Sequence, residues 1–71
     1  MDGREWIEAY AARLGIEPPS EQEAKEVLAL VGVAARDSER SAAPVAAWMA
    51  GQAGVTLDEA RRLAKDIGDG G

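Results

Sequence analysis

Two capping-box sequences and a set of well-placed glycines divide this chain into short helical segments, and that division limits its fold more than any other feature. Ser20 is followed by Glu23, and Thr56 by Glu59, the spacing at which a helix N-cap and the third helical residue exchange hydrogen bonds. Glycines follow the apolar stretches as stop signals: Gly15, Gly54 and Gly68. No segment alternates apolar and polar residues as a strand does. The sequence therefore predicts an all-α, compact four-helix domain, with helices at about 3–15, 21–38, 44–53 and 57–67.

The length allows one domain with a small core. Of 71 residues, 46% are apolar, but 15 of these are alanines, and short chains bury a low fraction of their surface. We interpret residues 1–67 as a single helical domain and 68–71 as a disordered tail. The large apolar residues at helical spacing form the predicted core: Trp6, Tyr10, Leu14, Val27, Leu28, Val31, Val45, Trp48, Met49, Leu57, Leu63 and Ile67.

The predicted helix 21–38 is apolar on most sides, so we expect it to lie at the centre of the domain. Its main stripe passes through Leu28 and Val31, whereas Leu30 and Val33 point away from that stripe. Gly32, in the middle of the helix, costs roughly 1 kcal/mol relative to alanine. We attribute it to the close approach of another helix.

Composition excludes several kinds of chemistry. The chain has no cysteine and no histidine, so it can form no thiolate or imidazole metal site, no disulfide, and no Cys or His nucleophile. Its carboxylates fall on polar helix faces or in turns, whereas a catalytic carboxylate needs burial or a like-charged neighbour to tune it. No glycine-rich phosphate loop is present. We therefore predict a non-enzyme with no catalytic residues, no cofactor and no metal.

Charge and hydropathy bear on partners and location. The net charge of −5 disfavours nucleic acid as a general partner. The charged start of the chain lacks the apolar region of a signal peptide. The longest uncharged run, 41–56, is too short and too weakly apolar to span a bilayer. We expect a soluble cytoplasmic protein without a membrane contact.

A polar segment, 36–41, lies between two nearly charge-free stretches and is the predicted working surface. Arg40 precedes a helix start, where free backbone N–H groups favour negative charge, and Trp48 could anchor an interface. We predict a partner or anion site formed by Arg36, Glu39, Arg40 and Trp48. The alternative is a charged corner in which the arginines pair with Asp37 and Glu39. The uncharged run 41–56 is open to two interpretations, a packed core helix or a docking face for a partner or for weak self-association.

Two other functions match parts of the sequence. The segment 48–65 resembles a helix-turn-helix, with Arg61, Arg62 and Lys65 on its second helix. Asp58 and Glu59 occupy the turn that such proteins aim at bases, which weakens a DNA-binding regulator as the alternative function. Asp-Ser at 37–38 matches the serine of acyl carrier proteins, but this serine falls at a helix end rather than a helix start.

Three segments together resemble a known family: 5–15 with its Glu-Trp start, the Pro-Pro-Ser-Glu at 18–21, and Ser-Glu-Arg-Ser-Ala-Ala-Pro at 38–44 with Trp48. They are similar to a small all-helical bacterial family of unknown function, found alone or fused to molybdenum cofactor guanylyltransferase. The resemblance implies an accessory role in making molybdopterin guanine dinucleotide, with that guanylyltransferase as a partner. It implies no catalytic residues. Members often carry a histidine near position 36, where this chain has arginine.

Overall fold

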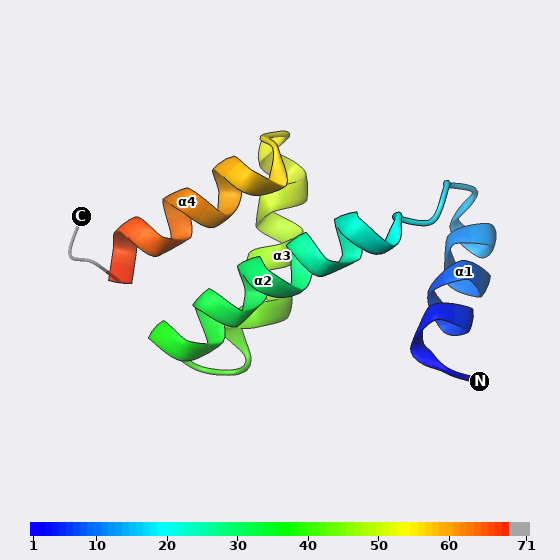
Figure 1. Cartoon of the computed structure of the whole chain (residues 1–71), viewed down its shortest axis with the longest axis horizontal. Coiled ribbons are helices and arrows are strands. Elements are labelled where there is room, and N and C mark those ends of the chain that lie inside the picture. The colour runs from blue at the N-terminus through cyan, green and yellow to red at the C-terminus, as the bar shows by residue number, and fades with distance from the viewer. Residues whose placement is uncertain (69–71) are drawn as a thin grey trace.

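A computed structural model describes residues 1–68 of the chain. It contains four α-helices, α1 (Gly3–Leu14), α2 (Glu21–Asp37), α3 (Ala42–Ala53) and α4 (Leu57–Gly68), and no strand within those residues (Figure 1). The predicted all-α four-helix domain is confirmed. Helix α2 packs against both α3 and α4, so its predicted central place is also confirmed.

Local sequence signals set the helix starts and stops. Asp2 and Ser20 form complete capping boxes at α1 and α2, and Thr56 Oγ1 accepts a hydrogen bond from the Glu59 N–H at the start of α4 (3.1 Å). Gly15 and Gly54 adopt positive φ angles of 75° and 72°, which glycine reaches without a steric penalty. The N-capping residues and the glycines therefore define three helix starts and two helix ends.

The start of α3 differs from its predicted position. The helix begins at Ala42 rather than 44, and Pro44 is its third residue rather than its first. Ser41 occupies the N-cap position without a side-chain cap hydrogen bond, while the Ala42 and Ala43 N–H groups donate to the carbonyls of residues 39 and 40. A proline is tolerated there because the first-turn N–H groups of a helix have no intrahelical partner.

The core is smaller than predicted and uses another face of α2. The buried apolar residues are Ala11, Leu30, Val33 and Ala60. Leu30 and Val33 were expected to point away, whereas Leu28 is 68% exposed. The prediction failed because α2 contacts α3 and α4 through its other stripe, and helical periodicity cannot say which of two apolar stripes a neighbour will cover.

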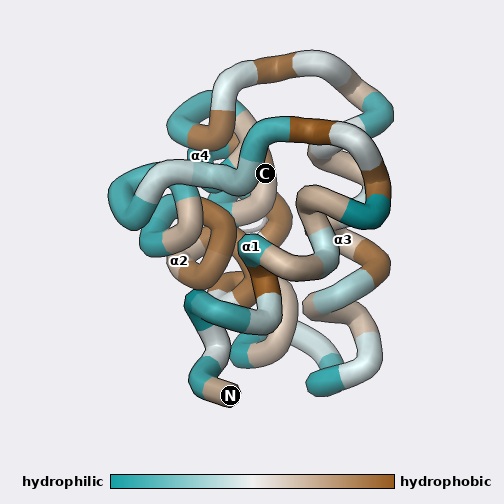
Figure 2. The backbone as a smooth tube through the Cα atoms, turned by 90° about the vertical axis from the view of Figure 1, so that its right-hand side faces the viewer, coloured by the Kyte–Doolittle hydropathy of each residue, from teal (hydrophilic) through white to brown (hydrophobic). Residues whose placement is uncertain are grey.

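None of the twelve predicted core side chains is fully buried. Three are half-buried, namely Val27, Val31 and Leu57. Nine are exposed: Trp6, Tyr10, Leu14, Leu28, Val45, Trp48, Met49, Leu63 and Ile67. Figure 2, seen from the α1 end, shows hydrophobic segments at the outer edge of the fold as well as inside it.

Helix α1 lies at one end of the molecule, apart from α3 and α4 (Figure 1). Arg4 Nη1 donates a hydrogen bond to the carbonyl of Pro19, in the connector between α1 and α2 (2.6 Å). Ile7 is half-buried and Ala11 is buried, so positions 4, 7 and 11 form the inward face of α1.

Gly32 and Gly68 differ from their predicted roles. Within residues 1–68, no other helix lies close to Gly32. The nearest group is the Arg36 guanidinium of the same helix, 3.2 Å from the position that a Cβ on Gly32 would take. Gly68, predicted as the first tail residue, is the last residue of α4. The rest of the predicted tail, 69–71, lies outside the described residues.

Candidate functional site

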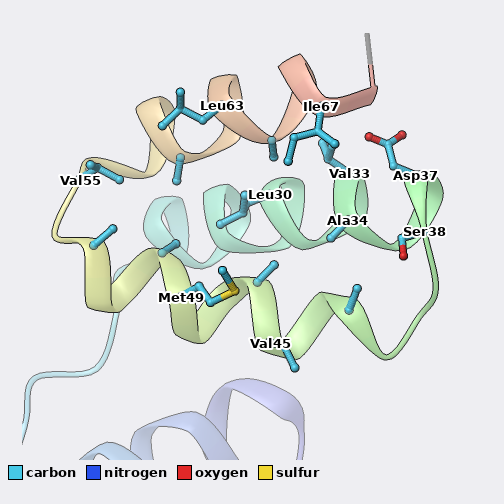
Figure 3. Close-up of a pocket in the computed structure, with 16 residues that line it drawn as sticks. Leu30, Val33, Ala34, Asp37, Ser38, Val45, Met49, Val55, Leu63 and Ile67 are labelled. Carbon is cyan, nitrogen blue, oxygen red and sulfur yellow. The ribbon is translucent and has the colours of Figure 1, made fainter. Parts of the chain in front are cut away.

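An apolar groove of about 510 Å³ runs along α2 between α3 and α4 (Figure 3). Helix α2 forms its floor, and α3 and α4 form its two walls. The main apolar side chains lining it are Leu30 and Val33 from α2, Val45 and Met49 from α3, and Leu63 and Ile67 from α4. The groove is therefore built from three helices that are separate in sequence.

The sequence of α3 and α4 explains why this space stays open. Where these helices line the groove they carry mainly alanine, at the one-turn spacing of Ala42, Ala46 and Ala50 in α3 and of Ala60 and Ala64 in α4. Alanines let each helix approach α2 closely, but they do not reach across to the opposite wall. Helices α3 and α4 consequently pack on α2 without extensive contact between them.

The larger apolar side chains that α3 and α4 contribute lie on the rims of the groove and are exposed to solvent. Met49 is 59% exposed, Leu63 47% and Ile67 77%. Such a concentration of uncovered apolar side chains beside a hollow is unusual for a free surface and is typical of interaction sites. The groove can thus accept an apolar ligand without first opening.

The two ends of the groove differ in polarity. Val55, in the α3–α4 turn, closes one end, and Asp37 with Ser38 closes the other (Figure 3). Asp37 is the one charged side chain among the lining residues described. Its carboxyl carbon lies 2.9 Å from where a Cβ on Gly68 would stand, so the end of α4 meets the end of α2. An occupant therefore meets a negative charge at one end only.

The residues predicted as a partner or anion site fall into two places. Arg36, Glu39 and Arg40 are exposed around the polar end of the groove, because they flank Asp37 and Ser38 in the chain. Trp48 is 67% exposed on α3 and is not among the residues that line the groove. The structure thus groups three of the four and leaves the tryptophan on another face.

The alternative interpretation, an ion-paired corner, is not realised in this part of the chain. Among residues 1–68 the ion pairs are Arg4 with Glu8 and Arg62 with Glu59, and neither involves the 36–41 segment. Ser41 Oγ lies 3.4 Å from Glu39 Oε2, a long hydrogen bond. The guanidinium groups at 36 and 40 are therefore available to other charges.

The basic residues of α4 are engaged differently from those of a DNA-reading helix. Arg62 Nε donates to Glu59 Oε2 (3.0 Å), and this hydrogen bond, together with the charge of Glu59, raises the pKa of the Arg62 guanidinium. One of the three cations on the predicted recognition helix is thus already paired with a carboxylate. A DNA-binding regulator remains the alternative function, which the acidic charge of the chain disfavours.

Sequence reasoning missed the groove as a site. Its signal is the repeat of alanine at 42, 46 and 50 beside larger apolar residues. This repeat lies within the uncharged run 41–56, which the sequence leaves open as a packed core helix or a docking face. Which face of α3 meets α2 depends on tertiary packing, so the repeat alone could not place the groove.

No group of three or more carboxylates within residues 1–68 is arranged to hold a metal ion. Across the same residues, the helices are too short or too polar to cross a membrane. Fold and site together define a small all-α domain with an apolar groove floored by its central helix.

The chain belongs to the family described as "Domain of unknown function (DUF6457)", whose model matches residues 1–69. This confirms the resemblance to a small helical family of unknown function. The match says nothing about a fusion to molybdenum cofactor guanylyltransferase. Searches of curated proteins and of solved structures find no match to this chain.

Proposed function

We propose that this protein is a non-catalytic interaction module that binds an apolar helix of a partner protein in the groove between α3 and α4. The observation that carries the proposal is the groove itself, whose floor residues are buried and whose apolar rims are exposed. Helices that lay an apolar face into a hydrophobic groove are a common recognition mode.

The energetics favour an apolar ligand over a polar one. Val45, Met49 and Leu63 are each about half exposed, so covering them contributes roughly 1 kcal/mol each. The floor residues Leu30 and Val33 are already buried, so they lose no further conformational entropy when a ligand binds. Since the groove is preformed, a partner helix loses mainly its own conformational freedom on binding.

The charged corner gives the groove a direction. Asp37 favours a cationic group at one end of a bound helix, and the neighbouring Arg36, Glu39 and Arg40 can form ion pairs with groups beyond that end. In this proposal these residues set orientation and selectivity. Trp48 remains a predicted second anchor for a partner that extends over the outer face of α3.

The family resemblance suggests the partner. We propose molybdenum cofactor guanylyltransferase, acting in the cytoplasm, as the partner, because the family that the sequence resembles is expected to occur fused to that enzyme. The nucleotide chemistry would then belong entirely to the enzyme, and this domain would hold or position it.

Binding to the purified guanylyltransferase of the same host, measured by titration calorimetry, tests the partner. Leu63→Glu places a charge on the groove wall and should abolish binding. Leu28→Glu is the matched control, since Leu28 is an exposed leucine on α2 that does not line the groove, and it should bind like the native protein. No heat of binding with the native protein would rule out this partner.

Photo-crosslinking in the native host tests the groove independently of the partner's identity. A photoreactive amino acid replaces Leu63 in one variant and Leu28 in the other, and crosslinked peptides are identified by mass spectrometry. We expect one partner segment with an amphipathic helical sequence, enriched at 63 over 28. Equal yields at the two positions would contradict groove binding.

A further inference from the structure

Helix α1 carries an apolar stripe that is about half exposed to solvent. Trp6, Tyr10 and Leu14 recur every four residues and are 54%, 50% and 54% exposed. The Trp6 and Tyr10 rings contact each other with centroids 5.0 Å apart and planes tilted by 35°. This α1 stripe is therefore a preformed apolar face of the kind the groove accepts.

The α1 stripe lies on a different side of α1 from Arg4 and Ala11. Arg4 donates to the Pro19 carbonyl, and Ala11 is buried. The connector 15–20 contains two consecutive prolines, which stiffen it. In the structure α1 lies at the end of the molecule, away from the groove of its own chain (Figure 1).

Helix α1 fits the groove in length and in charge. It has 12 residues, like α3 and α4, and so is roughly 18 Å long. Arg13 lies in its last turn, beside the α1 stripe, whereas the polar end of the groove carries Asp37. Placing Arg13 at Asp37 puts Trp6 near the uncharged Val55 end, with α1 parallel to α2.

The area is sufficient for a weak dimer. A covered aromatic side chain buries roughly 150–250 Å², and Trp6 and Tyr10 are each about half exposed. Adding Leu14 and the matching groove surface, each contact removes on the order of 500 Å², and two contacts on the order of 1,000 Å². That total lies at the low end for specific interfaces.

We infer that two copies of this chain associate by exchange, the α1 stripe of each lying in the groove of the other. Each chain carries both surfaces, so two equal contacts close the dimer. The inference rests on the proposed function of the groove and adds its regulation: α1 of a second copy occupies the groove until a partner helix displaces it.

Sedimentation velocity over micromolar to submillimolar protein tests the exchange. The native protein should shift from monomer to dimer across this range. Trp6→Ala should weaken dimerisation on the order of tenfold or more, as loss of an interface tryptophan does. Trp48→Ala is the matched control, an exposed tryptophan that does not line the groove, and it should leave the dimer unchanged.

A charge-reversal pair tests the direction of α1. Arg13→Glu and Asp37→Arg should each weaken the dimer, and the double variant should recover it, because the two charges then attract again. Circular dichroism of each variant checks that it remains folded. Recovery of the dimer in the double variant would also show that Asp37→Arg does not weaken the dimer by unfolding the chain.

A native protein that stays monomeric at every concentration would overturn the exchange, including the case in which α1 folds into the groove of its own chain. So would equal effects of Trp6→Ala and Trp48→Ala. The proposed function fails separately: a monomer that binds the guanylyltransferase, and loses that binding with Leu63→Glu, refutes the exchange alone. A dimer that never binds another protein refutes the partner alone.

Discussion

Replacing Leu30 by alanine should destabilise this domain far more than the same change at Leu28, two residues away on α2. Leu30 is 3% exposed and Leu28 is 68% exposed. Burial of a complete leucine side chain is worth about 2 kcal/mol. Leu28, with about a third of its surface covered, is worth at most about 0.7 kcal/mol on the same scale.

The cavity left by Leu30→Ala adds only slightly to the loss of stability estimated from the burial of this leucine. Leucine-to-alanine changes in closed cores cost about 2.7–5 kcal/mol because the cavity remains. Leu30 lines the groove, so water and the rim side chains can enter the space it leaves. We therefore expect the low end, about 2–3 kcal/mol, for Leu30→Ala, and under 1 kcal/mol for Leu28→Ala.

Urea denaturation followed by circular dichroism at 222 nm measures both values. For a domain this small, an m-value of about 1 kcal/mol/M converts the expected losses into midpoint shifts of about 2–3 M and under 1 M. If Leu30→Ala is already unfolded in water while Leu28→Ala is folded, the order still holds. Equal losses, or a larger loss at Leu28, would refute the packing of α2 described above.

Three further predictions concern single positions and the alternative function. Gly32→Ala should stabilise the domain by about 0.5–1 kcal/mol in the same assay, since only the movable end of Arg36 lies near the added Cβ; a loss would mean that a rigid neighbour blocks the site. Gly54→Ala should cost about 1–2 kcal/mol, because its φ is 72°; an unchanged midpoint would contradict the left-handed cap. In a gel-shift at low salt with micromolar protein, we expect no retardation of DNA, and retardation reduced by Arg61→Ala would favour the regulator instead.

The helices of this protein follow from local sequence. Asp2 and Ser20 form side-chain caps, and Gly15 and Gly54 end helices in a conformation that suits glycine. These interactions involve residues within four positions of one another, so the sequence carries them in full. The misplaced start of α3 has the same origin, since no side-chain cap marks it.

The faces of the helices depended on tertiary structure. Two apolar stripes compete on α2, and the contacts with α3 and α4 select the one through Leu30 and Val33. Likewise α1 buries the small side chain of Ala11 and leaves about half of the much larger Trp6 side chain exposed. A periodic pattern reports that a face is apolar, whereas burial depends on which helix lies opposite it.

The sequence by itself determined the helix count, three helix starts and two helix ends, the central place of α2, and the absence of thiol and imidazole chemistry, because these depend on residue type and near neighbours. Only the tertiary structure decided that the apolar surface gathers in a groove closed by Asp37 at one end and Val55 at the other. The groove exists because α3 and α4 each pack on α2 without extensive contact between them. That arrangement joins residues far apart in the chain, so no local pattern could specify it.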